Sequence, residues 1–305
     1  MSIKNFIQFK NTTFTYPIFS TNTDDDGKTI FPKPVFENFT ANLEGDFVSL
    51  VGPNASGKST LMLLASGRLK PENGSVKIFD INTDKFFTKQ SFDLGNGKTI
   101  FLNVANTETE EEKNLLASFV YQNMEFESDD KVSELLETVF ENGGYNRADS
   151  LSNQAKISNS FFEDVINVAE INNLMDKKLN RISKGETQRV FFAFSLLYGS
   201  KSIFMDEPFF AMEQKQKEKA LEFLKIHSKT HNIPVYISMH ELDLSKKYAE
   251  KILLFYPNRN LDYGTPQEVL TNDALEKSYG VPVAMLKDAE AFTRKNITEK
   301  NLTQF

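Results

Sequence analysis

The 305-residue sequence contains no cysteine and only three histidines. Without cysteine the chain can form neither a disulfide framework nor a thiolate zinc site. So few histidines also argue against a histidine metal cluster. The function of this protein must therefore depend on chemistry other than that of zinc.

Long apolar runs and an excess of positive charge are also missing. The apolar run VFFAFSLLYG is far shorter than the roughly 20 residues that cross a bilayer. The formal net charge is −7 and the pI is near 5.2, whereas domains that bind nucleic acid usually carry a basic patch. The first residues do not resemble a secretory signal peptide, because no basic region precedes an apolar one. We expect a cytoplasmic protein that binds no nucleic acid and reaches a membrane only through a partner.

The pattern of apolar residues predicts an α/β fold. Strands that alternate with helices imply a largely parallel sheet covered on both faces, and the helical stretch at about 124–185 is expected to form an inserted layer. Residues 20–34 and 80–115 are polar, and the acidic run TETEEEKN is expected to be a solvated face or loop. The expected strands are 3–16, 35–51, 75–79, 118–122, 201–208, 234–240 and 251–256; the expected helices are 58–70, 131–144, 160–179, 183–199 and 213–229, with another between 240 and 251.

The segment LVGPNASGKST at residues 50–60 fits the phosphate-binding pattern G-x-x-x-x-G-K-[ST]. The apolar run before it predicts a strand, and the helical spacing after it predicts a helix, which is the context that this motif requires. Its backbone N–H groups and its lysine would hold phosphates, and the hydroxyl of Ser59 would bind Mg²⁺. We therefore predict that a nucleoside triphosphate is bound by Gly52, Pro53, Asn54, Ala55, Ser56, Gly57, Lys58, Ser59 and Thr60.

A second motif, SIFMDEP, is an apolar strand that ends in two carboxylates. Asp206 can hold Mg²⁺, and Glu207 can polarise the water that attacks the γ-phosphate. The plainer alternative is an acidic strand end or a helix cap. The phosphate-binding loop in the same chain favours the catalytic interpretation.

RISKGETQRV at residues 181–190 resembles the signature of the ATP-binding cassette (ABC) family, L-S-G-G-[EQ]-x-Q-R. Five ordered motifs at the family's spacing extend this resemblance over roughly residues 3–270. It implies a P-loop NTPase of ABC ATPase type, with a mainly parallel sheet, an antiparallel β subdomain and the helical subdomain. Residues 1–270 would form one ATPase domain and residues 271–305 a C-terminal extension.

The resemblance also implies roles for residues outside the two motifs above. Taken singly, an aromatic, a glutamine or a histidine at these positions is more typical of a structural role, and only their order makes them informative. Tyr16 would stack on adenine, Gln122 would contribute to catalysis and bind Mg²⁺, and His240 would contact the γ-phosphate. The signature residues that would contact ATP are Ser183, Gly185 and Glu186.

The partners implied by the resemblance are a second copy of the chain and a membrane permease. Two copies would hold ATP head to tail, docked on transmembrane permease subunits at the inner face of the cell membrane. Residues 263–283 loosely resemble the ends of ATPases that energise iron-siderophore, haem and vitamin B12 importers, which would involve an extracytoplasmic solute-binding protein indirectly. An exporter subunit remains open as an alternative, as does an ABC ATPase acting on nucleic acid or ribosomes.

Three residues depart from the family pattern. Lys184 replaces the first glycine of the signature, and we expect it to point into solvent. Phe210 and Glu213 stand where the family usually has serine and aspartate in the loop that follows the acidic pair. These departures bear on communication between two nucleotide sites rather than on ATP binding itself.

Overall fold

The structure is a computed structural model that describes residues 5–17, 32–93, 99–122, 124, 128–146, 157, 160–210 and 212–286. The chain divides into two compact units. The first unit comprises Met1–Glu44 and Gly57–Lys113, and the second comprises Gly45–Ser56 and Asn114–Phe305. Most of the loop expected at 20–34, the start of the strand expected at 3–16 and the end of the C-terminal extension expected at 271–305 lie outside the described residues.

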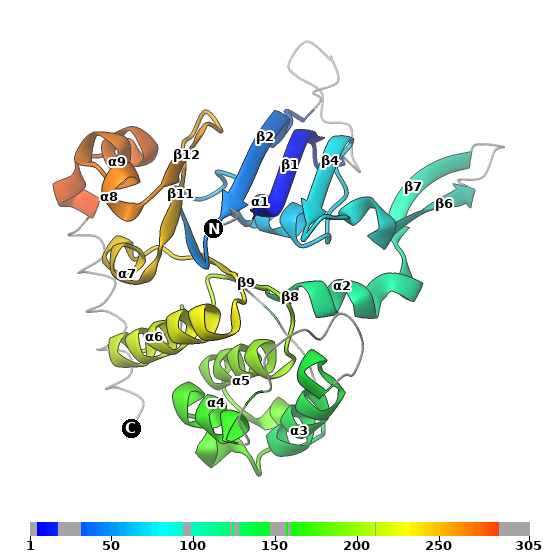
Figure 1. The fold of residues 1–305 in the computed structure, drawn as a ribbon, viewed down its shortest axis with the longest axis vertical. Helices are drawn as coiled ribbons and strands as arrows, with labels where there is room; N and C mark the ends of the chain where they lie inside the picture. The colour runs from blue at the N-terminus through cyan, green and yellow to red at the C-terminus, as the bar shows by residue number, and fades with distance from the viewer. Residues whose placement is uncertain are drawn as a thin grey trace. The chain divides into compact units, whose positions relative to one another are not determined.

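The first unit contains an antiparallel sheet in which the strand order is β2-β1-β4-β5. Alternate residues of its longest strand, such as Ile7 and Phe9, are buried, as expected for a strand with one face on a core. Helix α1 lies against β1 and β4 (Figure 1). The elements are β1 (Asn5–Phe14), β2 (Phe36–Glu44), β4 (Asn73–Ile78), β5 (Ile81–Asn82) and α1 (Lys58–Ala65).

The polar stretch at 80–115 forms regular structure, and its acidic run is an exposed helix start, which fits the expected solvated face rather than the alternative of a loop. Two of its segments pair as an antiparallel hairpin, which extends away from the four-stranded sheet of the same unit (Figure 1). The acidic run TETEEEKN contributes the first turn of a helix, where carboxylates interact favourably with the helix dipole. Its elements are η1 (Thr83–Phe86), β6 (Phe87–Asp93), β7 (Thr99–Ala105), η2 (Thr107–Thr109) and α2 (Glu110–Leu116).

The second unit contains a six-stranded sheet with the order β12-β11-β3-β10-β9-β8. All neighbours run parallel except β12, which is antiparallel to β11, so the predicted largely parallel sheet is confirmed. Because β3, β9 and β10 are parallel neighbours, their carboxyl ends meet at one edge, where ligands of α/β proteins usually bind. The strands are β3 (Phe47–Val51), β8 (Ser118–Val120), β9 (Ile203–Asp206), β10 (Val235–Ser238), β11 (Lys251–Phe255) and β12 (Leu261–Gly264).

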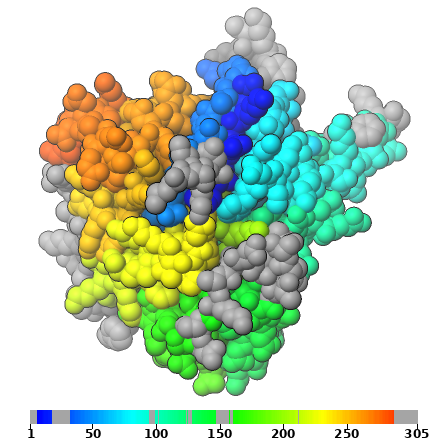
Figure 2. Space-filling view, viewed as in Figure 1, coloured from blue at the N-terminus to red at the C-terminus, as the bar shows by residue number. Residues whose placement is uncertain are grey.

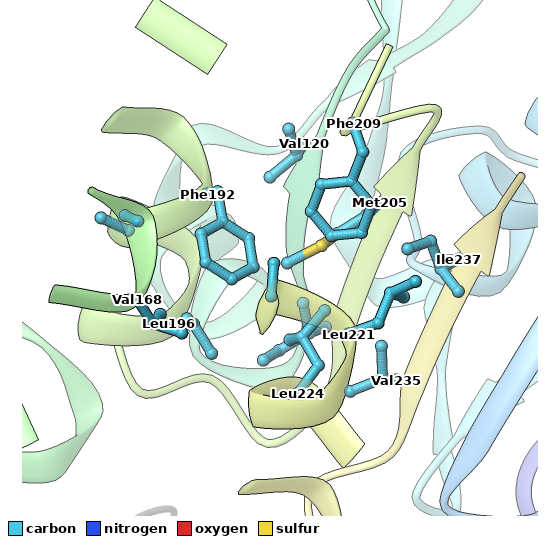
Figure 3. Close-up of a cluster of buried hydrophobic side chains, with 14 of the residues drawn as sticks. Val120, Val168, Phe192, Leu196, Met205, Phe209, Leu221, Leu224, Val235 and Ile237 are labelled. Atoms are coloured by element: carbon cyan, nitrogen blue, oxygen red, sulfur yellow. The ribbon is translucent and has the colours of Figure 1, made fainter. Parts of the chain in front are cut away.

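Helices pack around this sheet and bury an apolar core. In the close-up, Phe192 and Leu196 of α5 and Leu221 of α6 face Met205 of β9 and Val235 of β10 (Figure 3). Helices α3 and α4 lie between β8 and α5 in the chain, as the inserted helical layer predicts. The helices are α3 (Val132–Asn142), α4 (Phe161–Ala169), α5 (Lys184–Leu197), α6 (Gln214–His231), α7 (Leu242–Tyr248), α8 (Pro266–Val269) and α9 (Asn272–Tyr279), with short turns η3 (Gly144–Asn146), η4 (Asn172–Leu174) and η5 (Leu179–Arg181).

Parts of helix α6 (yellow) and of helices α3 and α4 (green) lie on the surface of the second unit (Figure 2). None of the helices in the described part of the chain combines the length and the apolar character that a membrane crossing requires.

A buried histidine of α6 lies in an aromatic cluster. The ring of His227 stacks on Phe161 at 5.2 Å and on Phe223 at 6.2 Å between centroids, and its Nε2 lies 3.2 Å from the hydroxyl of Tyr145. Burial, with a smaller contribution from the neighbouring charge of His231, lowers the pKa of His227 to about 3. The folded protein therefore keeps this imidazole neutral well below the pH at which the unfolded chain would protonate it.

The lowered pKa of His227 predicts that the free energy of unfolding falls as the pH becomes acidic. The stabilisation is complete above the unfolded pKa of about 6.5 and is lost as the pH falls toward the folded pKa, because only the unfolded state then takes up the proton. Between pH 7 and pH 5 the free energy of unfolding should fall by about 2 kcal/mol through this group. Urea unfolding at both pH values measures it. His227→Gln can still bond Tyr145 but cannot titrate, so an equal loss in the variant and the wild type would contradict the prediction.

Candidate functional site

The predicted phosphate-binding loop connects β3 to α1. Gly52 has a φ of +145°, and a Cβ there would lie 2.8 Å from the carbonyl oxygen of Phe255, so only glycine fits. Ala55 at +60° and Gly57 at +107° also have positive φ values, and such turns direct successive backbone N–H groups toward one point, as in anion-binding loops. The hydroxyl of Ser56 is buried and has no hydrogen-bond partner among the described residues, which suits a loop that donates to a bound ligand.

The first turn of α1 carries the polar residues of the motif. Lys58 and Thr60 are buried, and Ser59 is exposed. Within the same unit, the hydroxyl of Tyr16 lies 3.1 Å from Oγ1 of Thr60, and the Tyr16 side chain is 45% exposed. The ring of Tyr16 packs edge-on against Phe14. The structure thus places an accessible aromatic face beside the start of α1.

The strand-end carboxylates of the second unit form a connected group. Asp206, the last residue of β9, is buried, and its Oδ1 accepts a hydrogen bond of 2.5 Å from the hydroxyl of Ser238. The next residue, Glu207, has a φ of +49°, and its backbone N–H donates to the same hydroxyl at 2.9 Å. No sequence motif singles out Ser238, which is one polar residue at the end of an apolar strand.

The side chain of Glu207 joins two other predicted residues. Its Oε1 lies 2.7 Å from Nε2 of His240, and its Oε2 accepts a 2.6 Å hydrogen bond from Nε2 of Gln122. Gln122 follows β8 and His240 follows β10, so residues from three strand ends meet at one carboxylate. A mostly buried carboxylate held by two polar partners can orient a water molecule or accept a proton from it.

The residue after His240 is anchored to α6. Glu241 accepts a 2.5 Å hydrogen bond from Nζ of Lys217, a buried lysine of that helix. Sequence patterns gave no signal for this pair, because the two residues lie on separate elements and belong to no motif. The ion pair fixes the start of α7, which follows the segment that carries His240.

The signature residues lie at the start of α5. Ser183 is the N-cap: its hydroxyl accepts from the backbone N–H of Glu186, and the Glu186 carboxylate accepts from the backbone N–H of Ser183 at 2.7 Å. Burial alone would raise the pKa of Glu186, but the hydrogen bonds from Ser183 and the charge of Lys177 outweigh it, so this pKa is lowered. Gly185 is half-buried, and Lys184 is exposed, as expected.

The other two departures from the family pattern have different surroundings. Phe210 is 63% exposed, which is unusual for a large apolar side chain. Glu213 is the N-cap of α6, and its backbone N–H donates to the side chain of Gln216 in a capping box. Glutamate therefore caps this helix, a role that the family's aspartate could also fill.

Comparisons with known proteins agree with this geometry. A family profile described as ABC transporter matches residues 38–210, more than half of the chain. The match includes the phosphate-binding loop, Gln122, the signature and the acidic pair, while Tyr16 and His240 lie outside it. Two curated relatives are the manganese transport system ATP-binding protein MntB of Bacillus subtilis and the hemin import ATP-binding protein HmuV of Escherichia coli O157:H7. MntB is 26% identical over 84% of this chain and 90% of its own, and HmuV is 24% identical over 80% and 85%.

Solved structures show the same fold. A dimeric structure of a bacterial ABC transporter cassette matches with a TM-score of 0.60 and 22% identity, covering 82% of this chain and 94% of that one. CbiO1 of Clostridium perfringens, part of the transporter complex cbiONQ, matches with a TM-score of 0.59 and 17% identity over 88% and 92%. The predicted fold class is confirmed. The chain belongs to the ABC transporter family, as an ATP-binding and ATP-hydrolysing subunit.

Proposed function

We propose that this ATPase powers the import of a metal chelate or a similar solute through a membrane permease. The catalytic part of this proposal rests on one observation: the Glu207 carboxylate contacts both Gln122 and His240. Import is favoured because the relatives MntB and HmuV are named for manganese transport and for hemin import, and both align with at least four fifths of this chain.

In this proposal the phosphate-binding loop, Lys58 and Tyr16 bind the nucleotide. Lys58 and the backbone N–H groups of the loop hold the phosphates, and Tyr16 offers its exposed ring to the adenine. Ser59, Asp206 and the amide oxygen of Gln122 would hold Mg²⁺, and all three supply the oxygen ligands that this ion prefers. The amide nitrogen of Gln122 already donates to Glu207, so its oxygen is the atom left for a metal. Bound Mg²⁺ would neutralise part of the phosphate charge.

The second unit supplies the residues for hydrolysis. Glu207 orients the attacking water or accepts its proton, and His240 contacts the γ-phosphate. Nε2 of His240 lies 2.7 Å from Oε1 of Glu207, so the residue that would accept the proton and the residue that would contact the γ-phosphate are in direct contact. The Glu207 side chain is only 12% exposed, so most of it is shielded from bulk water.

A second copy of the chain would complete the site. Ser183, Gly185 and Glu186 lie at the start of α5, where backbone N–H groups and the helix dipole favour a phosphate. We propose that they contact the ATP held by the partner copy. ATP would then close the two copies, and its hydrolysis would separate them, at the inner face of the membrane on transmembrane permease subunits.

The permease contact can be tested by crosslinking in native membranes. Tyr121 is 44% exposed and precedes Gln122, so a photoreactive phenylalanine there should crosslink to a protein with several membrane spans. The same probe at Ile226, exposed on α6, serves as the matched control. Crosslinks from position 121 only to ribosomal or DNA-bound proteins would overturn the transport proposal in favour of the non-transport alternative.

The direction of transport needs a separate measurement. An importer should co-purify with an extracytoplasmic solute-binding protein, and its solute should accumulate inside cells in an ATP-dependent manner. Accumulation of the solute outside the cells would identify the exporter alternative.

A further inference from the structure

Ser238 makes two hydrogen bonds of opposite direction with the two strand-end carboxylate residues. The backbone N–H of Glu207 can only donate, so the hydroxyl accepts that 2.9 Å bond. The hydroxyl proton is then free for the 2.5 Å bond to Oδ1 of Asp206, which as a carboxylate can only accept. The donor and acceptor of both hydrogen bonds, from the Glu207 N–H to Ser238 and from Ser238 to Asp206, are therefore fixed.

The position of Ser238 makes this link rigid. The side chain is fully buried at the end of β10, and Ser238 lies directly opposite Asp206 in the parallel register of β9 and β10. It is also in register with Leu50 of β3, so both neighbouring strands support it. A hydroxyl held in the middle of a sheet has little freedom to move, in contrast to one on a loop.

The backbone of Glu207 needs such a link. Its φ of +49° lies in the left-handed region, which a residue with a side chain adopts only when its surroundings hold it there. This turn ends the extended path of β9 and sets where the carboxylate of Glu207 meets Gln122 and His240. The hydrogen bond from its N–H to Ser238 holds the turn at the residue where the strain is located.

We propose that Ser238 is a positioning residue for ATP hydrolysis, which holds Glu207 in its left-handed turn and orients Asp206 toward Mg²⁺. The proposal rests on the roles proposed above for Asp206 and Glu207. Ser238 does not contact the nucleotide in this proposal and acts only through these two residues.

A threonine and valine pair tests the hydroxyl at constant shape. Ser238→Thr keeps the hydroxyl and Ser238→Val lacks it, while the added volume is nearly the same. At saturating ATP and Mg²⁺ the valine variant should show a kcat about tenfold or more below that of the threonine variant, the effect of one hydrogen bond to a charged group. ATP affinity without Mg²⁺, measured by calorimetry, should agree within about twofold, and the Mg²⁺ concentration for half-maximal ATP binding should rise in the valine variant.

Ser202 provides the matched control. It is buried just before the opposite end of β9, and its hydroxyl donates to the carbonyl of Leu116 at 2.7 Å. The same threonine and valine pair at position 202 should give equal kcat values. Equal kcat losses for valine at both positions would show a general structural effect and overturn the proposal. If Ser238→Val does not fold, Ser238→Ala removes the hydroxyl without adding volume and gives the same comparison.

A double variant separates this proposal from the proposed function. In the Glu207→Gln background, Ser238→Val should add little to the loss of kcat at saturating Mg²⁺, because its target is already inactive. An undiminished effect there, or equal kcat values for Ser238→Thr and Ser238→Val, would overturn the role of Ser238 alone. A Glu207→Gln protein with the wild-type rate would instead overturn the proposed function.

Discussion

Replacing Lys58 with alanine is expected to abolish ATP hydrolysis and to weaken ATP binding by about 10- to 100-fold, the effect of losing a hydrogen bond to a charged group. Lys58 is the first residue of α1, where the helix dipole and the turns of the preceding loop already favour an anion. Alanine keeps the helix but removes the point charge that would bind the β- and γ-phosphates. Calorimetry measures the affinity, and phosphate release measures the turnover.

A matched lysine separates this effect from general loss of charge. Lys77 lies exposed on β4 of the same unit, and Lys77→Ala should bind and hydrolyse ATP as the wild type does. Because Lys58 is buried, Lys58→Met provides a second variant that keeps most of the side-chain volume. If both Lys58 variants folded and retained near wild-type affinity and turnover, the phosphate-binding assignment would be wrong.

Local features of the fold could be predicted from the sequence. The predicted phosphate-binding loop is one continuous segment in which the glycines, the lysine and the serine lie close together in the sequence, so its pattern is sufficient to find it. The end of α1 was less predictable: the apolar spacing continues to residue 70, but the helix ends at Ala65 because Gly67 adopts a left-handed φ of +68°. The strand expected at 35–51 is likewise two strands, β2 and β3, separated at Gly45 with a φ of +113°.

The polar stretch at 80–115 shows why exposed structure is hard to predict. Almost every side chain of β6 is exposed, so the strand has no buried face to impose an alternation of apolar residues. In α2 the acidic residues occupy the first turn, and Glu110 and Glu112 pair with Lys113 and Lys85 at 2.6 Å and 2.5 Å. A charge run of this kind has the same composition in a helix as in a loop.

Contacts between distant residues could not be predicted. The order of the motifs suggested that Gln122, Glu207 and His240 serve one reaction, but not that Glu207 would bridge the other two. Gln122 is 85 residues from Glu207, and their hydrogen bond depends on β8 and β9 being neighbours in the sheet. Ser238 was missed for the same reason, since its contact with Asp206 depends on the register of β9 and β10.

Glu207→Gln is expected to slow ATP hydrolysis by about 10²- to 10⁴-fold, the usual contribution of general acid–base catalysis, while ATP binding survives. The amide keeps the size of the side chain but has one oxygen in place of two, so it cannot accept hydrogen bonds on both sides as the carboxylate does. Glu222, exposed on α6, supplies the matched control, since Glu222→Gln makes the same chemical change away from the site and should keep the wild-type rate. A wild-type rate in Glu207→Gln would remove this residue from the chemistry.

The same variant should also change the oligomeric state. If ATP closes two copies and hydrolysis opens them, Glu207→Gln should accumulate as an ATP-bound dimer, whereas Lys58→Ala should remain monomeric because it binds the phosphates too weakly to close two copies. Size-exclusion chromatography with and without ATP compares the two. The exposed ring of Phe210 lies three residues beyond Glu207, at a position where the family usually has serine, so we expect it to affect closure. Monomeric elution of Glu207→Gln with ATP bound would contradict dimerisation by ATP alone, and Phe210→Ser in that background would then show whether this side chain prevents it.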